Sequence, residues 1–301
     1  MKLRATRFGS VVLAAISFIL LACAGPSVQS PPKNSDMENQ LSEMIESFKG
    51  DVGVYFKHLP SGEEIAINAD SLFPTASMIK VPILLSLFER IENSELDYDT
   101  TLVWLPEIVN YGGDGILSSF KDSSSISLTK LISLMITYSD NHASLWCQEL
   151  AGGGSTINAW LVENGYEKTR MNSRTPNRQD DWKKYGWGQT TPREMAELIT
   201  MIHNNQAVSA WGSEEMYRFL TRIYWDDEAL SQIPRTVQVA SKQGAVNESR
   251  SEVVLVNAPG GDYVFCIITN NQKDQSWDDS NAGFILLRQI SKLFWQNYGA
   301  S

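Results

Sequence analysis

Strand-type patterns at both ends of the chain enclose a long helical middle, and this arrangement limits the possible folds more than any other feature. Apolar runs typical of strands occur twice before residue 70 and three times after residue 236, at 52–58, 63–68, 237–241, 253–256 and 263–269. Helical spacing precedes the first pair, at 37–48, and follows the last strand, at 283–298. These strands can share a sheet only if the chain returns to its beginning.

The helical middle carries apolar residues at a period near 3.6. These patterns begin after Ser77 and continue at 128–136, 143–150, 156–163, 192–203 and 214–224. The element order predicts an α+β fold, with one antiparallel sheet built from both chain ends and flanked by helices. An all-helical lobe is expected over about 70–235. We expect a functional site in the cleft between sheet and lobe.

Composition is that of a globular protein with a substantial core. The chain has 301 residues, 43% of them hydrophobic, so disorder, collagen and repeat architectures are excluded. It carries 25 Lys and Arg against 35 Asp and Glu, a net charge of −10, with no basic run outside the extreme N-terminus. A nucleic-acid partner is therefore not expected. The 3 histidines are scattered, which argues against a metal site.

The first residues have the composition of an export signal. A positive start is followed by an apolar stretch at 11–22 and then by Cys23, in a Leu-Leu-Ala-Cys context that resembles a bacterial lipoprotein box. We predict a signal peptide at 1–22, a lipidated N-terminus and tether at 23–36, and a folded domain at 37–301. The chain would then be lipid-anchored in the cell envelope, on the periplasmic side or the outer surface. A plain secretory peptide cut nearby is the alternative.

Two cysteines remain beyond Cys23. Cys147 lies in an apolar helical pattern and Cys266 in a β-rich run. We predict that both are buried free thiols.

Ser77-Met78-Ile79-Lys80 places a hydroxyl and an amine one helical turn apart, where the amine can accept the hydroxyl proton. Chance alone yields about 1.4 such pairs in a chain of this composition. Four occur, and those beginning at Ser30, Ser118 and Ser127 lie in polar contexts. Ser77 instead opens a buried helical pattern, where it could also be an ordinary capping serine.

Two further short motifs follow in order. Ser139-Asp140-Asn141 lies between two expected helices, and Lys242-Gln243-Gly244 follows the expected strand 237–241. The second motif would place an ammonium group at the cleft end of a strand. Taken singly, a polar loop and a lysine at a strand end are both commonplace.

Together and in this order, the three motifs resemble the serine β-lactamase and penicillin-binding protein superfamily, and most closely its class A type. The resemblance runs from the hairpin at residue 52 to about residue 298. It implies that Ser77 is the nucleophile, that Lys80 is its base or proton relay, and that Ser139 passes a proton to the leaving nitrogen. Burial beside a second cation would lower the pKa of Lys80.

The resemblance also assigns substrate-binding roles. Asn141 would position Lys80 and the substrate's amide side chain, and Lys242 would hold the substrate carboxylate, next to Gln243. The backbone amides of Ser77 and Ala245 would form an oxyanion hole. No cofactor or metal is implied.

The chain departs from class A at the loop that normally supplies the deacylating glutamate. Aligned without gaps, the glutamate position falls on Thr175, and a threonine cannot be a general base near pH 7. Gln179 stands where the family has an Asn that binds water. Asp180 and Asp181 are the nearest carboxylates, and we expect them to be a solvated pair beside two lysines.

Substrate choice is a second departure. Gln243 replaces the hydroxyl residue usual in the family, Arg250 is a candidate second cation, and the loop carries the aromatic residues Trp182, Tyr185 and Trp187. These aromatics could pack the loop down or line a pocket for a different acyl group.

Four functions therefore stay open. The leading hypothesis is a monomeric, exported serine hydrolase that opens β-lactam amides. A penicillin-binding or drug-trapping protein would be acylated and then stall. A third reading keeps the acyl-enzyme but acts on a cell-wall peptide or another ester or amide. The fourth is a noncatalytic envelope lipoprotein. In each case the membrane is reached only through the N-terminal lipid.

Overall fold

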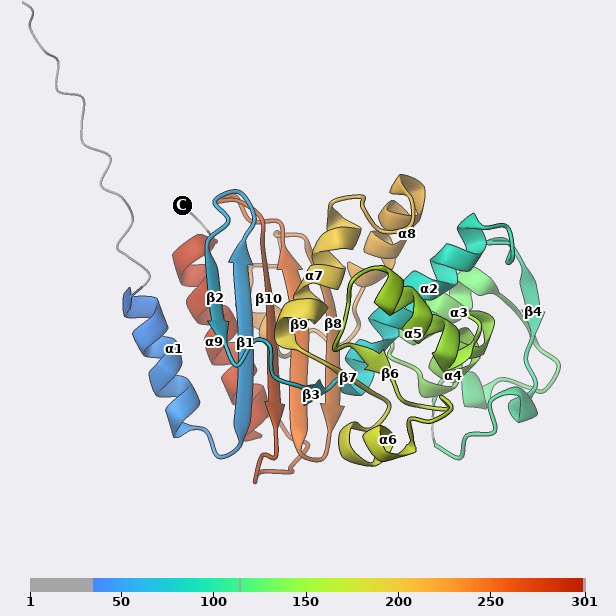
Figure 1. The fold of residues 1–301 in the computed structure, drawn as a ribbon, viewed down its shortest axis with the longest axis horizontal. Helices are drawn as coiled ribbons and strands as arrows, with labels where there is room; N and C mark the ends of the chain where they lie inside the picture. Colours follow the sequence, from blue (N-terminus) through green and yellow to red (C-terminus); the bar gives the residue numbers. More distant parts are fainter. Residues whose placement is uncertain (1–34, 114, 300–301) are drawn as a thin grey trace, which may run out of the picture.

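Both ends of the chain contribute to a single antiparallel sheet, as the sequence predicts. The computed structural model describes residues 35–113 and 115–299, and its main sheet has the order β2-β1-β10-β9-β8 (Figure 1). The strands are β1 (Asp51–His58), β2 (Glu64–Ile67), β8 (Val239–Val246), β9 (Ser249–Val256) and β10 (Tyr263–Asn270). β1 pairs with β10 along its full length, from Asp51 opposite Asn270 to His58 opposite Tyr263.

The sheet separates two apolar layers because successive side chains along a strand point to opposite faces. In β10, Phe265 and Ile267 pack against the terminal helices, while Cys266 and Ile268 join the core of the helical part. The terminal helices are α1 (Ser35–Ser47) and α9 (Ala282–Tyr298). Figure 1 shows both on one side of the sheet, with the helical part on the other. The sheet is therefore buried on both faces.

The helical part contains most of the predicted helices at nearly the predicted positions. Its helices are α2 (Lys80–Glu92), α3 (Leu128–Ile136), α4 (Asn141–Leu150), α5 (Gly153–Glu163), α6 (Gln179–Tyr185), α7 (Pro192–His203) and α8 (Ala210–Leu220). α8 begins and ends four residues earlier than predicted, and α6 was not predicted. Ser209 caps α8, its side chain accepting from the Gly212 amide, which fixes the earlier start.

The expectation of an all-helical lobe was wrong in detail. The region includes a three-stranded sheet of β3 (Phe73–Pro74), β7 (Gly188–Thr190) and β6 (Arg170–Met171). It also includes a two-stranded sheet of β4 (Thr101–Val103) and β5 (Ser125–Ser127). These strands of two or three residues are too short for an alternating pattern to be recognised in the sequence.

β8 and β9 are longer than the sequence predicted, which changes the setting of the third motif. Pairing between them continues from Val239 opposite Val256 to Val246 opposite Ser249. The segment Lys242-Gln243-Gly244 therefore lies inside β8 and not beyond its end. Lysine, glutamine and glycine have low strand propensity, so only the pairing with β9 reveals the strand.

The predicted signal peptide at 1–22 and residues 23–34 of the predicted tether, with Cys23, lie outside the described residues and stay predictions. Ser35 and Asp36, which were assigned to the tether, instead begin α1. Both remaining cysteines, Cys147 and Cys266, are free and fully buried, as predicted. Among residues 35–113 and 115–299, no helix is both long and apolar enough to cross a membrane.

Candidate active site

Ser77 lies on a 3-10 turn, η1 (Ala76–Ile79), that runs directly into α2. The turn is held against the main sheet at Gly244, where a Cβ atom would come within 2.6 Å of the Thr75 carbonyl oxygen and 2.9 Å of the Ser77 nitrogen. Ser77 is half-buried, while the residues on either side of it are buried. The fold thus leaves this hydroxyl accessible in an otherwise closed turn.

Lys80, one turn further on, is fully buried, and its side-chain nitrogen is surrounded by oxygen atoms from two motifs. Its Nζ donates to Ser77 Oγ at 3.1 Å, to Ser139 Oγ at 2.9 Å and to the Ser139 carbonyl at 2.6 Å, and lies 3.0 Å from Asn141 Oδ1. Burial lowers the pKa of Lys80 to about 7, against an opposing effect of Asp140. The predicted Ser77–Lys80 contact is therefore present, and the amine is partly neutral near pH 7.

Asp140 holds the second motif in place, a role that the sequence reasoning missed. It is the N-cap of α4, where its Oδ1 accepts from the Ala143 amide at 2.8 Å, while Oδ2 accepts from the Leu117 amide at 3.0 Å. Ser139 precedes it with a φ of 59°, in the left-handed region. The cap fixes Ser139 and Asn141 on either side of Asp140, and both then reach Lys80. A capping Asp before a helical pattern was the available signal.

Lys242 and Gln243 approach the site from β8. Lys242 is fully buried, and its Nζ donates to the Gln243 carbonyl at 3.1 Å and to Gln243 Oε1 at 2.7 Å. Burial lowers the pKa of Lys242 well below its usual value, repulsion from Lys80 lowers it further, and Glu252 opposes both effects. Burial is therefore the largest cause of the lowered pKa at both lysines, and repulsion between the two cations acts in the same direction.

A cavity of about 400 Å³ joins these elements. Of the predicted site residues, Ser77, Ser139, Gln243 and Ala245 line it together with Gly244. Lys80, Asn141 and Lys242 do not line it. The remaining lining residues were not predicted from the sequence and are mostly aromatic or acidic: Tyr138, Trp225, Asp227, Glu228, Trp277, Asp279 and Phe284, with Ser251 and Leu287. Most of these residues come from loops that no periodicity marks, whereas Phe284 lies in the first turn of α9.

Arg250 does not line this cavity. Its fully buried guanidinium donates to the Ser249 carbonyl at 2.9 Å and to the Ser276 carbonyl at 2.6 Å. It lies between two aromatic rings of the rim, with its central carbon 4.5 Å from the Trp277 ring centre and 4.7 Å from that of Phe284. Arg250 therefore supports the rim from behind.

Thr175 does not line the cavity at Ser77. Its side chain is buried, and its Oγ1 donates to the Ser173 carbonyl at 3.0 Å. A Cβ on Gly154 would come within 1.8 Å of Thr175 Oγ1. Its side chain therefore packs against the first turn of α5. Together with Gln179, Trp182 and other loop residues, Thr175 lines a second cavity, whose lining does not include Ser77.

The two aspartates of this loop are solvated, as predicted. Asp180 has a side chain that is 98% exposed and pairs with Lys183 at 3.0 Å, and Asp181 pairs with Arg178 at 3.2 Å. Both lie on α6, at the protein surface. Such exposed pairs contribute little to stability, and neither aspartate lines the cavity at Ser77.

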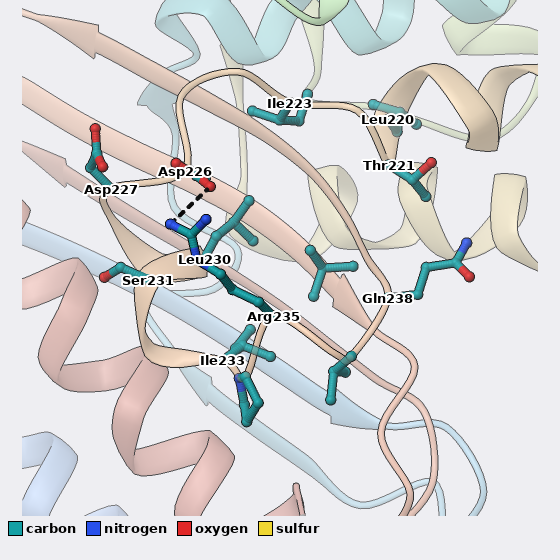
Figure 2. A pocket seen from close by; sticks show the side chains of 13 residues that line it. Leu220, Thr221, Ile223, Asp226, Asp227, Leu230, Ser231, Ile233, Arg235 and Gln238 are labelled. Carbon is teal, nitrogen blue, oxygen red and sulfur yellow. Dashed lines mark ion pairs between the residues drawn. The ribbon is translucent and has the colours of Figure 1, made fainter.

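Another pocket, of about 460 Å³, lies beside the end of α8 and the start of β8 (Figure 2). In Figure 2, Arg235 and Asp226 point toward one another, and their ion pair has a separation of 3.9 Å. Its described lining residues include Ser231 but no lysine. The pocket therefore lacks the serine–amine pair that defines the site at Ser77.

The fold and the contact between the accessible Ser77 and the buried Lys80 define a serine hydrolase of the class A-like β-lactamase and penicillin-binding protein type. A model of the beta-lactamase enzyme family matches residues 36–298, and the chain belongs to this family. Among curated proteins, it is similar to beta-lactamase VEB-1 of Pseudomonas aeruginosa, with 20% identity over 95% of this chain and 98% of the relative. The family resemblance inferred from the sequence is thus confirmed.

Solved structures agree on the fold. A mutant of PBP-A, described as an acyl-enzyme complex with penicillin G, superimposes with a TM-score of 0.76 at 24% identity, over 89% of this chain and 98% of that one. A class A beta-lactamase from Mycobacterium abscessus gives a TM-score of 0.75 at 18% identity, over 88% and 100%. The PBP-A mutant and the class A beta-lactamase from Mycobacterium abscessus therefore share the fold of this chain.

Proposed function

We propose that this protein is acylated at Ser77 by β-lactams, as a serine β-lactamase is, and that it releases the acyl group slowly. The observation that carries the proposal is the contact between Ser77 Oγ and the fully buried Nζ of Lys80 at 3.1 Å. The absence of a carboxylate at Thr175 supports the slow second step.

The hydrogen-bond count at Lys80 supports its role as the base. An ammonium group has three protons, yet four oxygens lie within 3.1 Å of Nζ. After losing one proton, the amine can keep donating to the Ser139 carbonyl and to Asn141, and its lone pair can accept the Ser77 proton. Because the pKa of Lys80 is about 7, this form is populated at neutral pH.

The acylation step balances with residues at the site. Ser77 Oγ forms a bond to the lactam carbonyl carbon while its proton moves to Lys80. The amides of Ser77 and Ala245 stabilise the oxyanion, and Lys242 holds the carboxylate. The carbon–nitrogen bond then breaks, and the nitrogen takes a proton from the Ser139 hydroxyl, which Lys80 restores.

Intact-protein mass spectrometry with benzylpenicillin, sampled over time, tests both halves of the proposal. Drug concentration is followed in the same tube, and Ser77→Ala is the control. We expect an adduct with the mass of the whole drug that lasts for many minutes and is missing in Ser77→Ala. No adduct and no drug loss in the unaltered protein would refute the acylation.

Rapid turnover is the second candidate, and one observation favours it. Three carboxylates, on Asp227, Glu228 and Asp279, line the same cavity as Ser77 and could activate water. Glu228 pairs with Arg288 at 2.8 Å, which engages one side of its carboxylate, while burial raises the pKa of this carboxyl. Fast drug loss with only a fleeting adduct would establish turnover, and loss of that turnover in Asp227→Asn or Asp279→Asn would identify the base.

A cell-wall peptide is the alternative substrate, since Gln243 and the aromatic rim shape a different pocket. Release of D-alanine from a peptide without drug turnover would favour it.

We also propose export and lipidation at Cys23, followed by a monomeric folded domain. Mass analysis of the mature N-terminus in cells expressing wild-type and Cys23→Ala proteins tests the lipid, and light scattering tests the monomer.

A further inference from the structure

Three exposed aromatic side chains lie beside Ser139 and have no role in the acylation chemistry. Tyr138 is 41% exposed, Tyr224 59% and Trp225 50%. The ring centres of Tyr138 and Tyr224 lie 5.2 Å apart, and Trp225 meets Tyr224 edge to face at 5.1 Å. The indole nitrogen of Trp225 also donates to the Tyr138 carbonyl at 3.0 Å. These three residues form an aromatic wall that is held in place by its own contacts.

The aromatic wall borders the place where the leaving group of a substrate would emerge. Tyr138 and Trp225 line the cavity at Ser77, and with Tyr224 they also line an adjoining cavity of about 610 Å³. Ser139 lines both cavities. In the acylation proposed above, Ser139 gives its proton to the leaving nitrogen. A group carried by that nitrogen would therefore lie against the aromatic wall.

The cavity at Ser77 is also acidic. Asp227, Glu228 and Asp279 line it, and none of its described lining residues is basic. Glu228 pairs with Arg288 at 2.8 Å, whereas neither Asp227 nor Asp279 has an ion pair among the described residues. Burial raises the pKa of Glu228, Arg288 opposes this, and Asp279 and Asp227 raise the pKa further. The three carboxylates are therefore close enough to repel one another, and two of them lack a partner.

Two buried cations lie behind the lining of this cavity. Arg250 packs on the ring of Trp277, with its central carbon 4.5 Å from the ring centre, and Lys242 donates to two oxygens of Gln243. Neither cation lines the cavity. The cavity surface therefore presents carboxylates and aromatic rings to an entering molecule.

Aromatic faces and carboxylates together suit an organic cation. The face of an aromatic ring attracts ammonium and pyridinium groups, and aromatic cages bind quaternary ammonium ligands in this way. Unpaired carboxylates add a charge attraction that a neutral group would not gain. Trp225 and Asp227 are two residues apart and line the same cavity, so one flat cation can contact both.

We propose that the cavity at Ser77 selects substrates that carry an organic cation on the side of the leaving nitrogen, held by the aromatic wall and by the carboxylates of Asp227 and Asp279. The consequence for substrate rests on the proposed function, while the preference in binding does not. A terminal D-alanine brings only a methyl group and a carboxylate to this side. The proposal therefore favours a lactam or other amide with a larger, cationic leaving part over a D-alanyl peptide.

Two cephalosporins are a matched pair of probes. Cephaloridine and cephalothin share the ring system, its carboxylate and the thienylacetyl side chain, but cephaloridine carries a pyridinium group where cephalothin carries a neutral acetoxy group. Calorimetry with Ser77→Ala, which cannot be acylated, measures the dissociation constant of each. We expect cephaloridine to bind about tenfold more tightly at low ionic strength, with a smaller preference in high salt. Equal dissociation constants, or no binding of cephaloridine, would overturn the proposal.

Carboxylate variants in the Ser77→Ala background test the charges. Asp227→Asn and Asp279→Asn each keep the size of the side chain and remove one charge, so each should reduce the ratio of the two dissociation constants about threefold. Asp122→Asn is the matched control, because Asp122 is exposed and does not line the cavity. A ratio unchanged in both cavity variants, or reduced equally in Asp122→Asn, would overturn the proposal.

Trp225→Leu in the same background tests the aromatic wall. It removes the ring and keeps an apolar side chain, so the ratio should again fall about threefold. Trp182→Leu is the matched control, since Trp182 is also 50% exposed but lies on α6 and does not line the cavity at Ser77. Equal ratios in the two tryptophan variants would contradict a role for the wall.

Acylation of the unaltered protein separates this inference from the proposed function. If neither drug forms an adduct while Ser77→Ala still prefers cephaloridine, the proposed function fails and the cation preference stands. If both drugs form adducts at Ser77 while Ser77→Ala binds them equally, the proposed function stands and the cation preference is refuted.

Discussion

Gly244→Ala should separate Ser77 from β8. A Cβ at this position would lie 2.6 Å from the Thr75 carbonyl oxygen, 2.8 Å from Ser251 Oγ and 2.9 Å from the Ser77 nitrogen. Two of these atoms belong to the backbone, so η1 must retreat by about 0.8 Å before the closest approach becomes an ordinary contact. We expect the free energy of unfolding to fall by about 1–3 kcal/mol.

The same displacement should slow acylation much more than it harms the fold. A misplacement near 1 Å at a reacting group costs roughly 100-fold in rate. The rate constant for adduct formation with benzylpenicillin and the urea midpoint measure the two effects. Gly112→Ala is the matched control, because a Cβ at Gly112 meets nothing within 4 Å. Wild-type acylation in a folded Gly244→Ala protein would refute the close approach of η1 and β8.

Three further predictions concern the same site. Because the pKa of Lys80 is lowered to about 7 and its neutral form is the base, the rate constant for acylation of Ser77 should rise with pH through about 7 and then level off. A rate constant that stays the same from about pH 5 to 9 would contradict this. Asp140→Ala removes the α4 cap and leaves a buried amide without an acceptor, so urea unfolding should show a loss of about 2–3 kcal/mol, and a loss below about 0.5 would count against the cap. In Thr175→Glu the longer side chain cannot fit against Gly154, so we expect its carboxylate to turn toward the ester on Ser77 and to shorten the lifetime of the adduct by about 100-fold. An unchanged lifetime would show that the carboxylate does not reach the ester.

The polypeptide's local patterns determined the elements and the chemical core of the site. Helical spacing located α2, α7 and α9 closely, because an amphipathic face repeats every three to four residues whatever it packs against. The Ser77–Lys80 contact could also be foreseen, since residues one turn apart on a helix face are neighbours without any help from the rest of the chain.

Tertiary structure alone decided which distant groups meet this pair. Lys242 lies inside a strand only because β9 pairs with it, and the acidic, aromatic rim is assembled from loops at 138, 225–228 and 277–279 and from Phe284 at the start of α9. The direction of Thr175 depends on contact with Gly154, and the partners of Glu252 come from Ser241 and Ala229. These contacts arise when the chain closes on itself, and burial then alters the pKa values of lysine and glutamate side chains whose local sequence predicts ordinary ones.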